Sequence, residues 1–159
     1  VLEEHAGGMR EGYRFRGLLP GGASTDFLVE QHLDVPMDFS SLEQAGSRLG
    51  TATMIVLDDR TCPVGATINL MRFFAQESCG WCTPCRDGLP WVVRTLVAFE
   101  LGDGREEDLR LLEHHCRLLG PGFTYCALAP GAVEPLQSAL KYFREDFERH
   151  IRERGCPWA

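Results

Sequence analysis

The chain has 159 residues, of which 44% are hydrophobic and 25% are charged, and this composition predicts a folded protein with a core. It contains no apolar run of about 18 residues and no basic start followed by a short apolar run. We therefore expect neither direct membrane insertion nor export. The formal net charge of −7 argues against nucleic-acid binding and favours a protein or a small molecule as the partner.

The beginning of the chain carries little structural signal. The first residue is Val1 rather than Met, and we expect the chain to be a piece of a longer protein. Residues 1–12 lack strong periodicity and contain the pair Gly7-Gly8, so they are predicted to form a flexible lead-in.

A compact, β-rich unit is predicted over residues 13–60. The alternation from Tyr13 to Arg16 and the apolar run from Thr53 to Leu57 both indicate strands. Between them, a short helix is expected over residues 42–45, capped by Ser40 or Ser41.

From about Ala66 onward the apolar residues recur at helical spacing, and four amphipathic helices are predicted. They run from about Ala66 to near Cys79, from Pro90 to Gly102, from Glu106 to Leu119 and from Val133 to Ile151. Four helices of this length should pack as a bundle over residues 66–153. The remaining tail, residues 154–159, contains Cys156, which we expect to be frayed.

Cysteines carry the strongest chemical signal. There are seven of them, an odd number in a chain without an export signal, which predicts reduced thiols or metal ligands rather than a disulfide framework. Cys79, Cys82 and Cys85 follow one another at intervals of three residues. Such spacing lets a turn direct three sulfurs at one centre, as in cysteine-ligated iron–sulfur clusters. Structural zinc sites more often use two separated pairs of ligands. Zinc ligation and ordinary thiols are the alternatives.

A four-iron cluster needs a fourth ligand, and spacing alone leaves Cys62, Cys116, Cys126 and Cys156 open. Cys116 has the helical spacing of neighbouring leucines and is explained as a core residue. Cys62 and Cys156 each precede a proline but are weak candidates. Cys126 follows a Gly-Pro-Gly break in a loop able to fold back over a metal centre, so it leads narrowly. No histidine pair, His114-His115 included, has a convincing metal-ligand spacing.

Several stretches together resemble a known family. Residues 77–88 (ESCGWCTPCRDG), followed by Thr124-Tyr125-Cys126-Ala127, resemble the cluster-binding region of the F-type, NADH-binding flavoprotein of bacterial respiratory complex I. Residues 20–25 and 46–51 resemble the soluble-ligand-binding β-grasp domain of that family, and residues 130–144 resemble its closing helix.

The resemblance implies an α+β fold in which a small β-grasp-like domain, residues 13–60, precedes an iron–sulfur helical bundle, residues 66–153. It also implies the ligands of a [4Fe-4S] cluster, which are Cys79, Cys82, Cys85 and Cys126. The family's larger amino-terminal domain, which binds FMN and NADH, has no counterpart in these residues. We therefore expect FMN and NADH in the full-length protein only.

On this resemblance, the chain is the electron-transfer part of an NADH:quinone oxidoreductase, and its cluster receives single electrons from reduced FMN and passes them towards quinone. Its partners are then the other peripheral-arm subunits of complex I. Its place is cytoplasmic, at the cytoplasmic face of the inner membrane. Two alternatives stay open: a diaphorase subunit of a soluble NAD-linked hydrogenase or formate dehydrogenase, and a zinc-stapled, non-redox assembly module.

Overall fold

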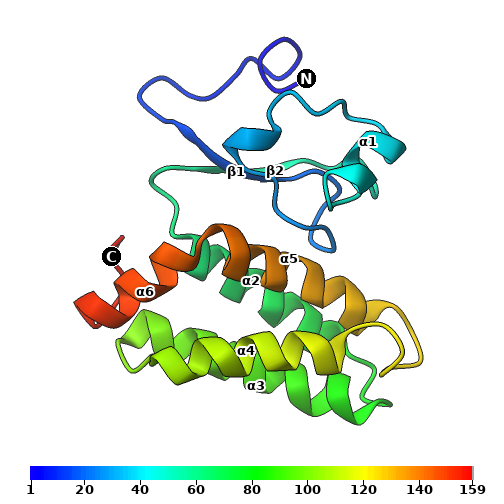
Figure 1. Ribbon diagram of the computed structural model, residues 1–159, viewed down its shortest axis with the longest axis vertical. Coiled ribbons are helices and arrows are strands. Elements are labelled where there is room, and N and C mark those ends of the chain that lie inside the picture. The colour runs from blue at the N-terminus through cyan, green and yellow to red at the C-terminus, as the bar shows by residue number, and fades with distance from the viewer. Residues whose placement is uncertain (159) are drawn as a thin grey trace.

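The computed structural model describes residues 1–158, which form a two-stranded sheet and a larger helical region. Figure 1 shows helices α2 (Pro63–Glu77) and α5 (Leu128–Tyr142) lying between the N-terminal part on one side and helices α3 (Thr83–Leu101) and α4 (Glu106–Leu119) on the other. Among the described residues, no helix combines the length and the apolar character needed to cross a bilayer.

The sheet is small and antiparallel. Strand β1 (Phe15–Leu19) pairs with β2 (Ile55–Asp58), and a register shift between Phe15 and Gly17 indicates a bulge. Both predicted strands therefore exist, but their ends lie one to three residues further along the chain than expected. The reason is burial, because Leu19 and Leu57 are the strand residues that join the core. The expectation of a β-rich unit was too strong, since turns and two short helices make up most of the described N-terminal part.

Those short elements are a 3₁₀ helix, η1 (Glu30–His32), and helix α1 (Phe39–Gln44). The N-cap of α1 is Asp38, not a serine as predicted. The Asp38 carboxylate accepts a hydrogen bond from the backbone N–H of Ser41 at 2.8 Å, and this bond lowers the pKa of Asp38. A carboxylate also suits the positive end of a helix better than a hydroxyl does.

Helix α2 ends before the cysteine loop, as predicted. The prediction that the next helix starts at Pro90 was wrong. Helix α3 begins at Thr83 and carries Pro90 in its interior. Pro84 takes the early position that suits proline, where a missing N–H costs nothing. Pro90 then removes one hydrogen bond from the helix without ending it. As a consequence, the triple-cysteine motif overlaps the beginning of α3.

The third predicted helix is confirmed as α4, with the bounds expected from the sequence. The turn before it depends on Gly102, the C-cap of α3, which has a left-handed φ of 85°. A Cβ atom built on Gly102 would clash with the backbone oxygen of Arg154. The tail of the chain therefore lies directly against the end of α3.

The fourth predicted helix is two helices, α5 and α6 (Arg144–Glu153), which meet at Phe143. Phe143 has non-helical backbone angles and is buried, with its ring 5.2 Å from that of Phe27 in an edge-on contact. The helix is therefore interrupted at the residue whose ring packs against Phe27. The apolar spacing continues through it, so the sequence pattern reads as one helix.

The N-terminal part and the helices share a core. Leu19, Phe27 and Leu57 belong to the same buried cluster as the apolar faces of the long helices. The backbone N–H of Phe27 donates to the hydroxyl of Ser138 on α5 at 2.8 Å. The N-terminal part therefore packs against the helical region through α5.

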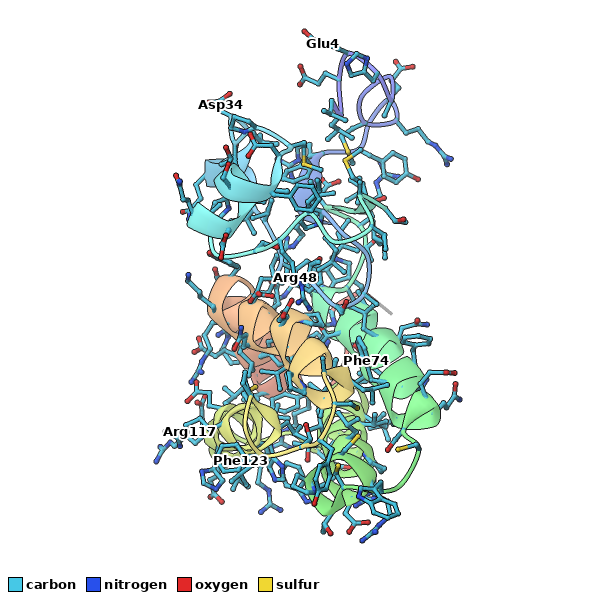
Figure 2. The ribbon with its side chains drawn as sticks, turned by 90° about the vertical axis from the view of Figure 1, so that its right-hand side faces the viewer. Glu4, Asp34, Arg48, Phe74, Arg117 and Phe123 are labelled. Atoms are coloured by element: carbon cyan, nitrogen blue, oxygen red, sulfur yellow. The ribbon has the colours of Figure 1, made fainter. Side chains whose placement is uncertain are left out.

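A half-buried ion pair crosses the same junction. Arg48, whose place beside α5 is labelled in Figure 2, contacts the Glu134 carboxylate at 2.8 Å. Burial raises the pKa of Glu134 to about 7, although Arg48 opposes this shift. One oxygen of this carboxylate is buried without a hydrogen-bond partner among the described residues, in agreement with the raised pKa.

Candidate iron–sulfur site

The triple-cysteine motif lies where α2 connects to α3. Helix α2 ends at Glu77, and Gly80 turns the chain in a left-handed conformation with φ of 79°. Cys82 is the N-cap of α3, and Cys85 is the third residue of that helix. Helix geometry therefore fixes two of the three sulfurs, while Cys79 lies in the loop before them.

The three thiols differ in their surroundings. The side chain of Cys85 is buried, and its sulfur lies 3.2 Å from the hydroxyl of Ser78. Cys82 is half-buried and Cys79 is exposed. The Ser78 hydroxyl also accepts the backbone N–H of Gly80 at 3.3 Å, which holds the loop against the start of α3.

The predicted fourth ligand approaches this loop from a distant part of the sequence. Cys126 lies, exposed, in the loop between α4 and α5, which carries Phe123 at the end of the helical region seen in Figure 2. The backbone N–H of Tyr125 donates a hydrogen bond to the sulfur of Cys82 at 3.4 Å. Consecutive Cα atoms are about 3.8 Å apart, so the Cys126 backbone lies close to the triple-cysteine loop.

Electrostatics at the site favour negative charge. The N-terminus of α3 is the positive end of the helix dipole, and Cys82 and Cys85 are located there. Four thiols and backbone donors make up a donor set that suits an iron–sulfur cluster. The Arg86 guanidinium forms a surface ion pair with the exposed carboxylate of Asp87 at 3.0 Å. It also donates a hydrogen bond to the Gly80 carbonyl at 3.3 Å, which helps to fix the conformation of the loop.

Other cysteines lie elsewhere. Cys116 is half-buried against the core on α4, and burial raises its pKa to about 12, in agreement with a structural role. Cys62 precedes α2, whose 15 residues separate it from the triple-cysteine loop by about 22 Å. Cys156, expected to be frayed, lies instead beside Cys62. This part of the chain is discussed further below.

Exposed aromatic residues surround the candidate site. A shallow hollow between the two loops is lined in part by Trp81, Phe123 and Tyr125. Their exposed fractions are 76%, 57% and 88%, which is unusual for such large apolar side chains. Exposed apolar groups of this kind are typical of interaction surfaces.

Comparisons with known proteins identify the family. Residues 65–150 match the family model of the NADH-ubiquinone oxidoreductase-F iron-sulfur binding region. The chain is 60% identical to the F-type subunit of NADH-quinone oxidoreductase from Escherichia coli (strain K12) over 96% of its length, and 45% identical to the corresponding protein of Streptomyces coelicolor over 99%. It covers 34% and 35% of those proteins, so it spans about a third of the length of the relatives that it matches.

The chain also resembles solved structures in its fold. An NAD⁺-reducing [NiFe]-hydrogenase in its H₂-reduced state matches 90% of the chain with a TM-score of 0.74 and 26% identity, and the match covers 24% of that chain. The resemblance drawn from the sequence is thus confirmed, and the matched region contains all four predicted ligands. The chain belongs to the family of the NADH-ubiquinone oxidoreductase-F iron–sulfur binding region.

Proposed function

We propose that this chain is the electron-transfer part of an NADH:quinone oxidoreductase, in which Cys79, Cys82, Cys85 and Cys126 bind a [4Fe-4S] cluster. The observation that carries the proposal is the hydrogen bond from the Tyr125 N–H to the Cys82 sulfur, because it joins the two cysteine loops. When bound, the cluster supplies reversible one-electron transfer.

The residues around the four thiols have separable roles in this proposal. Cys85 provides the buried sulfur, and burial lowers access of water to that side of the site. The Ser78 hydroxyl and the Tyr125 N–H contact two of the sulfurs, and donors of this kind stabilise negative charge on thiolate ligands. Cys79 and Cys126 are on the exposed side, which an electron donor or acceptor can approach.

The rest of the enzyme lies outside this chain. Trp81, Phe123 and Tyr125 form an exposed apolar rim that suits contact with further parts of the same polypeptide or with other peripheral-arm subunits. In the proposed enzyme, those parts bind FMN and oxidise NADH, and electrons continue towards quinone. The proposed location is the cytoplasmic face of the inner membrane, reached through the complex. The proposed architecture is a β-grasp-like domain followed by a four-helix bundle.

A second candidate is the diaphorase subunit of an NAD-linked hydrogenase. The structural match to the NAD⁺-reducing hydrogenase favours it, but that match is only 26% identical. Identity of 60% to the Escherichia coli NADH-quinone oxidoreductase protein favours the first candidate.

If NADH is oxidised by other parts of the enzyme, the chain with its bound cluster should accept one electron per cluster but oxidise no NADH. Anaerobic titration with dithionite, followed by optical and EPR spectroscopy, measures the first property. NADH oxidation with ferricyanide as acceptor, with and without added FMN, measures the second. Turnover of NADH by the 159-residue chain, or the absence of a reducible centre, would contradict the proposal.

A further inference from the structure

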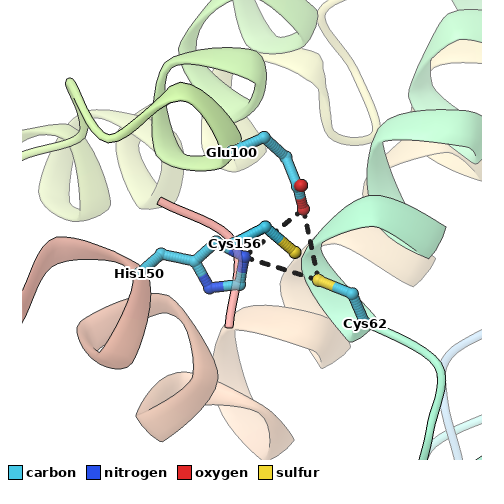
Figure 3. Close-up of side chains that lie close together, drawn as sticks. All are labelled: Cys62, Glu100, His150 and Cys156. Carbon is cyan, nitrogen blue, oxygen red and sulfur yellow. Dashed lines mark hydrogen bonds and ion pairs between the residues drawn. The ribbon is translucent and has the colours of Figure 1, made fainter. Parts of the chain in front are cut away.

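A group of side chains of the types that bind metal ions lies at the opposite end of α2. Cys62, Glu100, His150 and Cys156 each offer one ligand atom, and these atoms all lie within 4.8 Å of one another. Figure 3 shows the four side chains directed at a common point. They come from the residue before α2, the end of α3, the end of α6 and the tail.

The spacing fits a tetrahedral ion. Cys62 Sγ lies 3.2 Å from Glu100 Oε1 and 3.4 Å from His150 Nε2, and the latter two atoms are 3.3 Å apart. Zinc binds nitrogen, oxygen and sulfur at about 2.0 to 2.3 Å, which gives tetrahedral edges of about 3.3 to 3.8 Å. These three distances are therefore close to the edges of a zinc site, and the group needs to expand only slightly to hold the ion.

The histidine is already oriented as a ligand. His150 is fully buried, and its Nδ1 lies 2.6 Å from the backbone oxygen of Asp146. A carbonyl oxygen only accepts, so Nδ1 carries a proton, and Nε2 is the ring nitrogen that faces the group and can bind a metal ion. Metal-ligating histidines are commonly fixed by such a bond on their other nitrogen. The ring of Trp158 stacks on the imidazole at 6.0 Å.

The chemistry of the group also favours binding of a cation, because the four ligand atoms are electron-pair donors that lie close together. Nε2 of His150, the Glu100 carboxylate and the two sulfurs all face one small volume, and the only side-chain nitrogen near Glu100 among the ion pairs of the described residues is Nε2 itself. The Gly65 N–H donates to Cys62 Sγ at 3.3 Å, at the positive end of α2, which favours a thiolate there. Burial and the nearby carboxylate raise the pKa of the free Cys62 thiol, so a metal must displace its proton.

We propose that Cys62, Glu100, His150 and Cys156 form a structural Zn²⁺ site, separate from the iron–sulfur site. Zinc binding releases the two thiol protons and joins one sulfur from each cysteine, Nε2 of His150 and one oxygen of Glu100 to the ion. With all four positions taken by protein, no place is left for a substrate. The ion ties the start of α2 and the ends of α3 and α6 to the tail.

The test is metal analysis of the full chain, purified anaerobically with its iron–sulfur cluster, incubated with Zn²⁺ and passed through gel filtration. We expect about one zinc per chain in addition to iron. His150→Asn and Cys156→Ala should each lower bound zinc at least about tenfold and leave the iron content unchanged. Cys116→Ala is the matched control, because it removes a half-buried thiol outside the group, and should retain the zinc.

A second readout does not depend on the variants. Replacing zinc with Co²⁺ should give the visible absorption of a tetrahedral site with thiolate ligands, and added Zn²⁺ should raise the melting temperature of the unaltered chain. The proposal is overturned if zinc is absent, if the His150 and Cys156 variants bind as much zinc as the control, or if anaerobic chains contain a Cys62–Cys156 disulfide. Iron and zinc are counted separately, so failure here leaves the proposed function untouched.

Discussion

Replacing Cys126 with alanine should abolish the four-iron centre. The other three proposed ligands come from one loop and the first turn of α3, and Cys126 alone comes from the loop between α4 and α5. Without its sulfur, one iron loses its protein ligand, and the centre should lose iron or fail to assemble. Iron content and the EPR spectrum of the reduced, anaerobic chain measure the effect.

Cys116→Ala serves as the control for this experiment. It removes a thiol on α4 that packs against the core and is not one of the proposed ligands, and it should leave the iron content and the reduced spectrum unchanged. A Cys126→Ala chain with full iron content and an unaltered reduced spectrum would contradict the ligand assignment. In that case one of the other cysteines supplies the fourth sulfur.

Replacing Phe147 with alanine should strongly lower the free energy of unfolding. Phe147 is fully buried on α6, and its ring meets that of Phe99 on α3 edge-on at 5.6 Å. Removing a buried aromatic ring costs about 3 to 5 kcal/mol, through lost burial and the cavity left behind. Total stabilities of about 5 to 15 kcal/mol make this a large fraction. Denaturant unfolding followed by circular dichroism measures the loss.

Phe73→Ala is the matched control, because it removes the same ring from α2 where 49% of the side chain is exposed. Its cost should be well below that of Phe147→Ala, since little apolar surface returns to water. Equal losses from the two variants would show that α6 does not pack against the core as described.

Local signals in the sequence predict several elements well. The spacing of Leu109, Leu112 and Leu119 identifies α4, and Gly102 identifies the end of the helix before it. Local signals fail to predict an element's ends where contacts between residues far apart in the sequence determine them. Phe143 breaks a continuous helical pattern as its ring packs against Phe27, which lies far away in the sequence. Pro90 is a plausible helix start until Pro84 is seen to take that place.

The two proposed metal-binding groups differ in how far the sequence predicts them. Cys79, Cys82 and Cys85 are close neighbours, so their spacing alone indicates a cluster, whereas Cys126 needed the family resemblance. The second group has no such local spacing. Its members are separated by 38 residues for Cys62 and Glu100 and by 88 for Cys62 and His150. The Cys62-Pro and Cys156-Pro pairs were visible in the sequence, but nothing there linked either one to Glu100 or His150.

The most direct test of the central claim is iron and acid-labile sulfide analysis, combined with EPR, on the unaltered chain assembled without oxygen. The account predicts about four iron and four sulfide per chain, and on reduction one paramagnetic centre per chain. A chain that holds only about two iron atoms, or only zinc at Cys79, Cys82, Cys85 and Cys126, would contradict it.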